Sequence, residues 1–276
     1  MAYIAKYLLS IEEFMDTEKG EALMERAFLR VDEARREKAG RMKTPAGRAA
    51  CLGAGLMLRY AVAEALRDGG GGDPGGFGEG NAGGFCGRQR PYSVTELLDC
   101  GKEIPNREIA YRYGEQGKPY FANLPFYFSL SHSGSYVLCG LSMEEIGADI
   151  QQHCGRDVGK LARRFYSRRE AAVLEQAGAE QEKQFYRLWT RKEAYGKLTG
   201  KGIGAALGVD LLPEVSPAVE AVAEMSFLPE GRCLVWEEYG VSEDYSIAFC
   251  QYTAPISHNQ PGTGHQYPAG QAAWER

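Results

Sequence analysis

The sequence predicts an α+β fold of two lobes with a site in the cleft between them. A strand, helices and further strands come before about residue 146, and a strand, two helices and closing strands follow. At 276 residues the chain is long enough for two modest hydrophobic cores. We therefore expect an N-terminal lobe over residues 1–146 and a C-terminal lobe over residues 147–253.

The N-terminal elements follow from short apolar patterns. Residues 3–9 are typical of a strand, a basic helix is predicted at about 22–43, and a second helix at about 47–67. Thr44-Pro45 predicts the break between the two helices, because proline does not continue a helix that precedes it.

Two segments lack the composition of a packed element. Residues 68–91 (DGGGGDPGGFGEGNAGGFCGRQRP) are so rich in glycine that ordering them would cost much entropy, which predicts a flexible surface insertion. Residues 254–276 show no periodicity and predict a disordered tail.

The β-rich pattern begins near residue 126. FYFSLSHSG and YVLCGLSM predict two strands around a turn at Gly134, and IGADI predicts a third. The remaining expected elements are helices at about 157–177 and 181–198, a glycine-rich turn at 200–208, and strands at about 219–228, 232–239 and 245–252.

Composition and charge limit the possible partners and location. The net charge of −5 does not favour binding of nucleic acid by the whole molecule. The N-terminus has no basic region before its short apolar stretch, and we expect neither a signal peptide nor a membrane span. The seven cysteines are scattered, with no CxxC pair, as is typical of a protein of the reducing cytoplasm.

Asp149 and Gln151 are candidate metal ligands at the end of a predicted strand. Residues two apart on a strand share one face, so both side chains can offer oxygen atoms to the same point. Hard cations such as Mg²⁺ prefer oxygen ligands of this kind. An aspartate that merely caps the next element explains the same position, and by itself the spacing favours that simpler explanation.

Glu193 and Lys197 lie four residues apart on a predicted helix and therefore share one of its faces. A solvated ion pair is the usual meaning of this spacing. Trp189 on the same helix indicates a buried side that would fix the charged face in place. Gly196 is costly inside a helix, which is understandable if a ligand or another backbone comes close.

Ser131-His132-Ser133 permits a Ser–His hydrolase built on Ser131 or Ser133, but strand geometry disfavours it. Neighbouring residues on a strand point to opposite faces, so His132 cannot easily activate Ser131. The GxSxG elbow of α/β hydrolases is also absent. His132 is better suited to contact a phosphate or a hydroxyl, although a purely structural histidine remains possible.

A set of basic residues could bind a polyphosphate, because clustered cations suit such ligands. A solvated helix face explains most of them equally well. The set consists of Arg35, Arg36, Lys38, Arg41, Lys43, Arg48 and, further along the chain, Lys118.

The order of these motifs resembles that of the Sfp-type 4'-phosphopantetheinyl transferases. The family pattern of a G-[IV]-D strand end followed by W-x-x-K-E-A-x-x-K is similar to Gly147-Ala148-Asp149 and to the run from Trp189 to Lys197. The resemblance spans roughly residues 30–205 without the glycine-rich insertion. Further matching segments are Gly117-Lys118-Pro119, Ser131-His132-Ser133, Phe165-Tyr166-Ser167-Arg168-Arg169-Glu170 and Gly200-Lys201-Gly202.

The resemblance implies two similar α+β lobes related by a pseudo-twofold axis, with coenzyme A and Mg²⁺ bound in the cleft between them. The implied reaction moves phosphopantetheine from coenzyme A to a serine of an acyl or peptidyl carrier protein and releases 3',5'-ADP. The implied enzyme is cytoplasmic and monomeric, with no nucleic-acid or membrane partner. A non-catalytic module that binds coenzyme A or a carrier protein is the alternative.

The resemblance also implies roles for single residues. Asp149 and Glu193 would bind the metal, and Gln151 stands where many members carry a further acidic ligand. Lys197 would lie beside the pyrophosphate, and Glu193, acting through a water molecule, or Glu170 would be the general base. The expected contacts to coenzyme A are Arg35, Lys38, Arg48, Lys118, Ser131 and His132.

Overall fold

The computed structural model describes residues 4–68, 90–101, 109–155, 157–212, 224–228, 233–239 and 241–253. The fold is α+β, as the sequence predicts. Most of the predicted glycine-rich insertion and the whole predicted tail lie outside the described residues.

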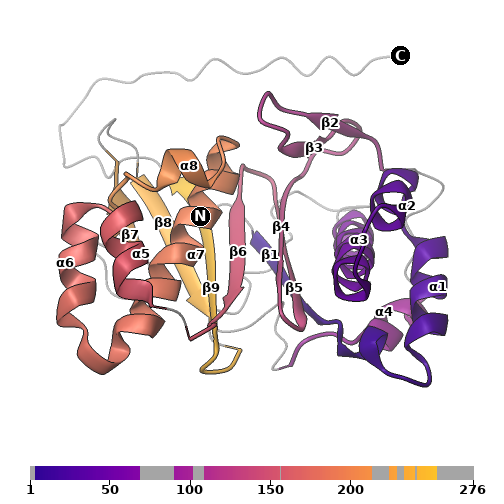
Figure 1. Cartoon of the computed structure of the whole chain (residues 1–276). Helices are drawn as coiled ribbons and strands as arrows, with labels where there is room; N and C mark the ends of the chain where they lie inside the picture. The colour runs from indigo at the N-terminus through magenta and orange to yellow at the C-terminus, as the bar shows by residue number, and fades with distance from the viewer. Residues whose placement is uncertain are drawn as a thin grey trace, which may run out of the picture.

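The N-terminal half is a three-stranded antiparallel sheet against which the long helix α3 packs (Figure 1). The strand order is β1-β5-β4, and α1, α2 and α4 pack against α3. The elements are β1 (Ile4–Ser10), the 3₁₀ turn η1 (Glu12–Met15), α1 (Gly20–Arg30), α2 (Glu33–Gly40), α3 (Pro45–Asp68), α4 (Val94–Asp99), β4 (Tyr127–Ser133) and β5 (Tyr136–Ser142).

Helix α3 forms the centre of this half because it is apolar on nearly every side. Leu52, Met57 and Leu58 are completely buried, and α3 makes contacts with both β1 and β5. By length and composition Pro45–Arg67 could cross a membrane, and 83% of its most apolar window is buried inside the protein. The sequence predicts a helix at about 47–67 but no membrane span.

The predicted basic helix at 22–43 is two helices. Val31 is extended after α1, and the Asp32 side chain accepts a hydrogen bond from the backbone N–H of Arg35, which caps the start of α2. The structure also differs from the sequence-based prediction in the hairpin of β2 (Tyr111–Tyr113) and β3 (Pro119–Phe121), which the sequence did not predict. Strands of three residues are too short to show alternation.

The C-terminal half is a four-stranded antiparallel sheet, crossed by α7. The strand order is β6-β9-β8-β7, and α7 contacts both β6 and β9. The elements are β6 (Gly147–Gln152), α5 (Val158–Phe165), α6 (Arg168–Gln176), the 3₁₀ turn η2 (Gly178–Glu180), α7 (Gln181–Thr199), α8 (Ile203–Ala206), β7 (Glu224–Phe227), β8 (Cys233–Tyr239) and β9 (Tyr245–Thr253).

The predicted helix at 157–177 is also two helices, because Ser167 begins a new one. Its hydroxyl accepts from the N–H of Glu170, and the Glu170 carboxylate accepts from the N–H of Ser167, which completes a capping box at the start of α6. The expected turn at 200–208 contains the one-turn helix α8.

The two sheets meet at β4 and β6, which lie side by side at the centre of the molecule (Figure 1). Strand β4 pairs with β5 and β6 pairs with β9, so β4 and β6 belong to different sheets. Serine side chains of β4 bond to the backbone of β6 across the space between these two strands. Ser129 Oγ accepts from the N–H of Ala148 at 2.9 Å, and Ser133 Oγ accepts from the N–H of Gln152 at 2.9 Å. We call this line of contacts the seam. The lobe boundary at residue 146 and the pseudo-twofold relation stay predictions.

Gly147 begins β6 where α7 crosses it closely. A Cβ at this position would lie 2.0 Å from the carbonyl oxygen of Ala194, so the motif requires glycine for space. We expect Gly147→Ala to lower the free energy of unfolding by roughly 1–3 kcal/mol, as overpacking does. Urea denaturation measures this difference.

Gly204 provides the matched control, since nothing lies within 4 Å of a Cβ built there. Gly204→Ala should leave stability unchanged or raise it slightly, because alanine favours the helix. Equal losses in the two variants would contradict the steric explanation.

Candidate functional site

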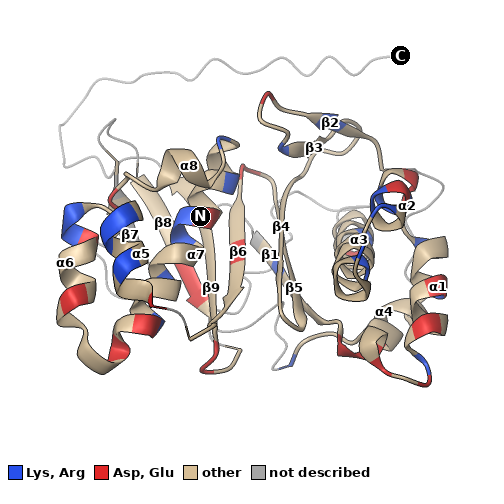
Figure 2. Cartoon of the chain, viewed as in Figure 1, with Lys and Arg blue, Asp and Glu red and all other residues tan. Residues whose placement is uncertain are grey.

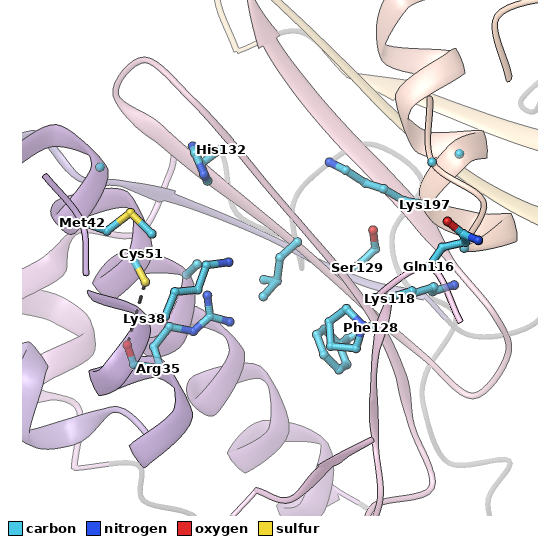
Figure 3. A pocket seen from close by; sticks show the side chains of 18 residues that line it. Arg35, Lys38, Met42, Cys51, Gln116, Lys118, Phe128, Ser129, His132 and Lys197 are labelled. Atoms are coloured by element: carbon cyan, nitrogen blue, oxygen red, sulfur yellow. Dashed lines mark hydrogen bonds between the residues drawn. The ribbon is translucent and has the colours of Figure 1, made fainter. Parts of the chain in front are cut away.

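A pocket of about 440 Å³ opens between the two halves of the molecule. Its walls come from α2, the start of α3, the turn of the β2–β3 hairpin, β4, and the C-terminal end of α7 with the glycine-rich turn after it. Figure 3 shows the side chains of α2 and those of β4 and α7 on opposite walls. A concave site with apolar walls and a few charged groups is typical of a small-molecule site.

The pocket gathers cations from segments far apart in the sequence. The lining residues that the sequence predicted are the cations Arg35, Lys38, Lys118 and Lys197 together with His132. Figure 2 shows basic residues on α2 and on α7, in opposite halves of the molecule. Converging cations bind phosphate groups, so the pocket is suited to a polyphosphate.

Lys118 joins the hairpin to the other half of the molecule. Its Nζ donates to the carbonyl oxygen of Leu198 at 2.8 Å, near the C-terminal end of α7, where unpaired carbonyls attract cations. Burial lowers the pKa of Lys118 below its ordinary value, and Glu145 opposes this shift. The hairpin thereby forms one wall of the pocket.

His132 faces the pocket from β4. Its pKa lies below the ordinary value, because loss of solvent and the positive charges of Lys197 and Lys38 disfavour the imidazolium. Asp149 acts in the opposite direction. His132 is therefore a neutral group near pH 7 that can become a further cation at lower pH.

Asp149 is buried beside the pocket and accepts two hydrogen bonds on one oxygen. Ser131 Oγ donates to Oδ1 at 2.6 Å, and Lys197 Nζ donates to the same Oδ1 at 2.7 Å. Lys197 also donates to the carbonyl oxygen of Ala148 at 3.1 Å. Helix α7, β6 and β4 thus meet at this carboxylate.

Glu193 lies close enough to Asp149 to feel its charge. Burial and the negative charge of Asp149 raise the pKa of Glu193, while Lys197 lowers it. Two carboxylates that repel each other in a half-buried place suit a divalent cation, which would relieve the repulsion. Within the described residues no three His, Cys, Asp or Glu side chains form a metal cluster, so a cation here would rely on this pair and on other oxygen atoms.

Gln151 is held through the nitrogen of its side-chain amide. Nε2 donates to Ser133 Oγ at 3.3 Å and to the carbonyl oxygen of Gln152 at 3.0 Å. These bonds tie the predicted third ligand to the seam, and its direct contact with a metal stays a prediction.

Ser131 and His132 point to opposite sides of β4. Ser131 Oγ bonds to Asp149 across the seam, and His132 lines the pocket. The arrangement of a hydroxyl activated by the neighbouring imidazole is therefore not formed, in agreement with the expectation from strand alternation.

Two predicted site residues lie elsewhere. The Arg48 guanidinium lies 5.9 Å from the centre of the Phe28 ring, and Arg48 lines a separate depression with residues of α1. Glu170 is fully buried and pairs with Lys192 at 2.9 Å, and its other oxygen accepts from the N–H of Leu211. Both Glu170 oxygens are thus used inside the C-terminal half, and this argues against Glu170 as the base.

The same contacts explain a lysine that the sequence analysis left without a role. Lys192 is fully buried, and its Nζ donates to the carbonyl oxygens of Ala206, Leu207 and Val209 as well as pairing with Glu170. Lys192 therefore fixes the segment after α8 against α7, whereas the neighbouring Glu193 lies within reach of the Asp149 charge.

Gly196 is required in α7 because the backbone of the glycine-rich turn passes close to it. A Cβ on Gly196 would lie 2.7 Å from the backbone carbon of Gly202, and the N–H of Gly202 donates to the carbonyl oxygen of Gly196. The close approach of another backbone that the sequence predicted is therefore present.

The sequence did not predict the apolar and amide residues that line the pocket, among them Met42, Gln116 and Phe128. Their side chains carry no motif, and only the segment Gly117-Lys118-Pro119 indicated this part of the wall.

The fold and site define an α+β protein with a cationic pocket next to a pair of carboxylates. A model of the 4'-phosphopantetheinyl transferase superfamily matches residues 145–250. The chain is 40% identical over 174 residues to a Synechocystis protein named as a 4'-phosphopantetheinyl transferase, covering 57% of this chain and 67% of that protein. It is 31% identical over 164 residues to the 4'-phosphopantetheinyl transferase Sfp of Bacillus subtilis, covering 57% and 69%.

Another Bacillus subtilis 4'-phosphopantetheinyl transferase is 32% identical over 149 residues, covering 51% of this chain and 62% of that protein. The alignments thus span about two thirds of the relatives' own length. The chain belongs to the 4'-phosphopantetheinyl transferase superfamily.

The lowered pKa of His132 predicts how binding of 3',5'-ADP depends on pH. As pH falls through this pKa, the imidazole gains a positive charge, so affinity measured in EDTA should rise relative to that of His132→Gln. Calorimetric titration of both proteins between pH 7.5 and 5.5 gives the difference, with the phosphate's own titration common to both. Parallel pH profiles would contradict a phosphate contact by His132.

Proposed function

We propose that this chain transfers 4'-phosphopantetheine from coenzyme A to a serine of an acyl or peptidyl carrier protein and releases 3',5'-ADP. One observation carries the proposal: four predicted cations and His132 line one pocket, and one of the cations, Lys197, is hydrogen-bonded to the buried Asp149. Membership of the superfamily supports the same activity.

Coenzyme A suits the chemistry of the pocket. Its nucleotide carries three phosphate groups, and Arg35, Lys38, Lys118 and His132 offer positive charge or hydrogen-bond donors to them. The apolar walls can cover the adenine or part of the pantetheine arm. Arg48 is left out of this proposal because it lies against Phe28.

Asp149 and Glu193 would hold Mg²⁺, and this assignment is supported by the repulsion between their charges. The bound ion would neutralise pyrophosphate oxygens as charge moves onto the leaving group. Gln151 can offer the ion only a neutral amide oxygen. Water and the pyrophosphate itself would supply the other ligands of the ion.

In the proposed reaction the carrier serine hydroxyl attacks the β-phosphorus of coenzyme A. A new P–O bond forms to the serine oxygen, and the bond between the β-phosphorus and the bridging oxygen breaks, so that 3',5'-ADP leaves with the bond's electron pair. Glu193 accepts the serine proton through a water molecule, and Lys197 offsets the charge that develops on the leaving phosphate. Positioning and charge neutralisation supply most of the catalysis in phosphoryl transfer.

A cytoplasmic monomer with two pseudo-twofold-related lobes completes the proposal. The six cysteines within the described residues are all free thiols, which supports a reducing compartment. Mere binding of coenzyme A or of a carrier protein, without transfer, is the competing function.

The direct test is to incubate the protein with apo carrier protein, coenzyme A and Mg²⁺ and to measure the carrier's mass. We expect a phosphopantetheine adduct that is absent when EDTA is added. Binding of both partners without any adduct would show the non-catalytic module instead.

Glu193→Gln should separate catalysis from stability. Loss of the base should lower the rate of transfer by about 100-fold or more. Because the pKa of Glu193 is raised, the folded protein disfavours its ionised form, and ionisation lowers stability as pH rises through that pKa. In EDTA near pH 7 the variant should therefore be at least as stable as the wild type, as urea denaturation would measure.

Glu170→Gln is the contrasting variant. It leaves the buried Lys192 without its counter-ion, so we expect a lower free energy of unfolding, with kcat per folded molecule preserved. Retention of activity by Glu193→Gln together with its loss in Glu170→Gln would reverse the assignment of the base.

A further inference from the structure

Ser131 lies at the seam, on the side of β4 opposite to that of His132. Its side chain is buried, and it is not among the residues that line the pocket, whereas His132 beside it is. Ser129, two residues earlier on the same face of β4, does line the pocket, so Ser131 is kept out of it by its burial against Asp149 and not by alternation alone. A contact between the buried Ser131 and a nucleotide in that pocket is therefore disfavoured.

The Ser131 hydroxyl makes a short hydrogen bond to Asp149. Oγ donates to Oδ1 at 2.6 Å, and Lys197 Nζ donates to the same oxygen at 2.7 Å. Two donors from different elements, β4 and α7, fix the rotation of the carboxylate. Both bonds use Oδ1, which leaves Oδ2 as the oxygen that can take another ligand.

The backbone around Asp149 is held by the serines on either side of Ser131. Ser129 Oγ accepts from the N–H of Ala148, and Ser133 Oγ accepts from the N–H of Gln152. Ser129 thus bonds to the main chain of β6, Ser133 bonds to its main chain and to the Gln151 side chain, and Ser131 bonds to the Asp149 carboxylate. The three serines are evenly spaced on β4, but they bond to different groups of β6.

We propose that Ser131 is a positioning residue, which orients the Asp149 carboxylate so that Oδ2 faces the divalent cation, and that it does not contact the nucleotide. This inference rests on the proposed function only in taking Asp149 as a ligand of that cation. Partners that orient a ligating carboxylate commonly contribute substantially to metal affinity.

The test compares Ser131→Ala with Ser129→Ala in the full chain, using Mn²⁺ as the probe. Binding is followed by electron paramagnetic resonance of free Mn²⁺ with coenzyme A present at saturation. We expect Ser131→Ala to weaken Mn²⁺ binding about 10-fold or more, and its affinity for 3',5'-ADP in EDTA to stay unchanged. Ser129→Ala removes a hydroxyl that belongs to the same seam and lines the pocket, but that bonds to the main chain alone; it should keep the Mn²⁺ affinity.

Thermal unfolding verifies that both variants are folded. The inference is overturned if Ser131→Ala keeps its Mn²⁺ affinity, if it loses affinity for 3',5'-ADP in EDTA, or if Ser129→Ala weakens Mn²⁺ binding equally. Carrier loading by the wild type is measured in parallel. A wild type whose Mn²⁺ affinity depends on Ser131 but which loads no carrier would overturn the proposed function and leave this inference standing.

Discussion

The contact between β4 and β6 is the constraint on which the site depends. Each strand is an edge of its own sheet, and an edge carries backbone groups that need partners. Ser129 and Ser133 supply those partners through their hydroxyls, so the two sheets are joined without a shared ladder. The same alternation turns His132 toward the pocket and Ser131 toward Asp149.

Helix α7 completes the site because it packs closely on β6. Gly147 permits this approach, and Lys197 can then reach the carboxylate of Asp149 from the last turns of the helix. Lys192, one residue before Glu193, points into the protein interior, where it pairs with Glu170 and binds the segment after α8. Neighbouring charged residues of one motif thus serve different purposes, since successive residues on a helix face different directions.

The chemistry-bearing residues could be recognised in the sequence because their types and order are unusual together. Lys118, His132 and Lys197 were expected around one ligand, and they do line one pocket. Arg48 and Glu170 lie away from the pocket for a common reason. Both residues were assigned from their positions along the chain. Position alone does not determine which way a side chain faces or which residue it contacts, here Phe28 for Arg48 and Lys192 for Glu170.

The sequence by itself determined the α+β class, most strands and the long helices, because periodic apolar patterns and capping residues are local properties. It did not reveal the breaks at Asp32 and Ser167, where a single capping side chain outweighs a continuous helical pattern. Only the tertiary structure decided that Ser131 and Lys197 share one oxygen of Asp149. These groups come from three separate elements, and their distances depend on packing that no local pattern records.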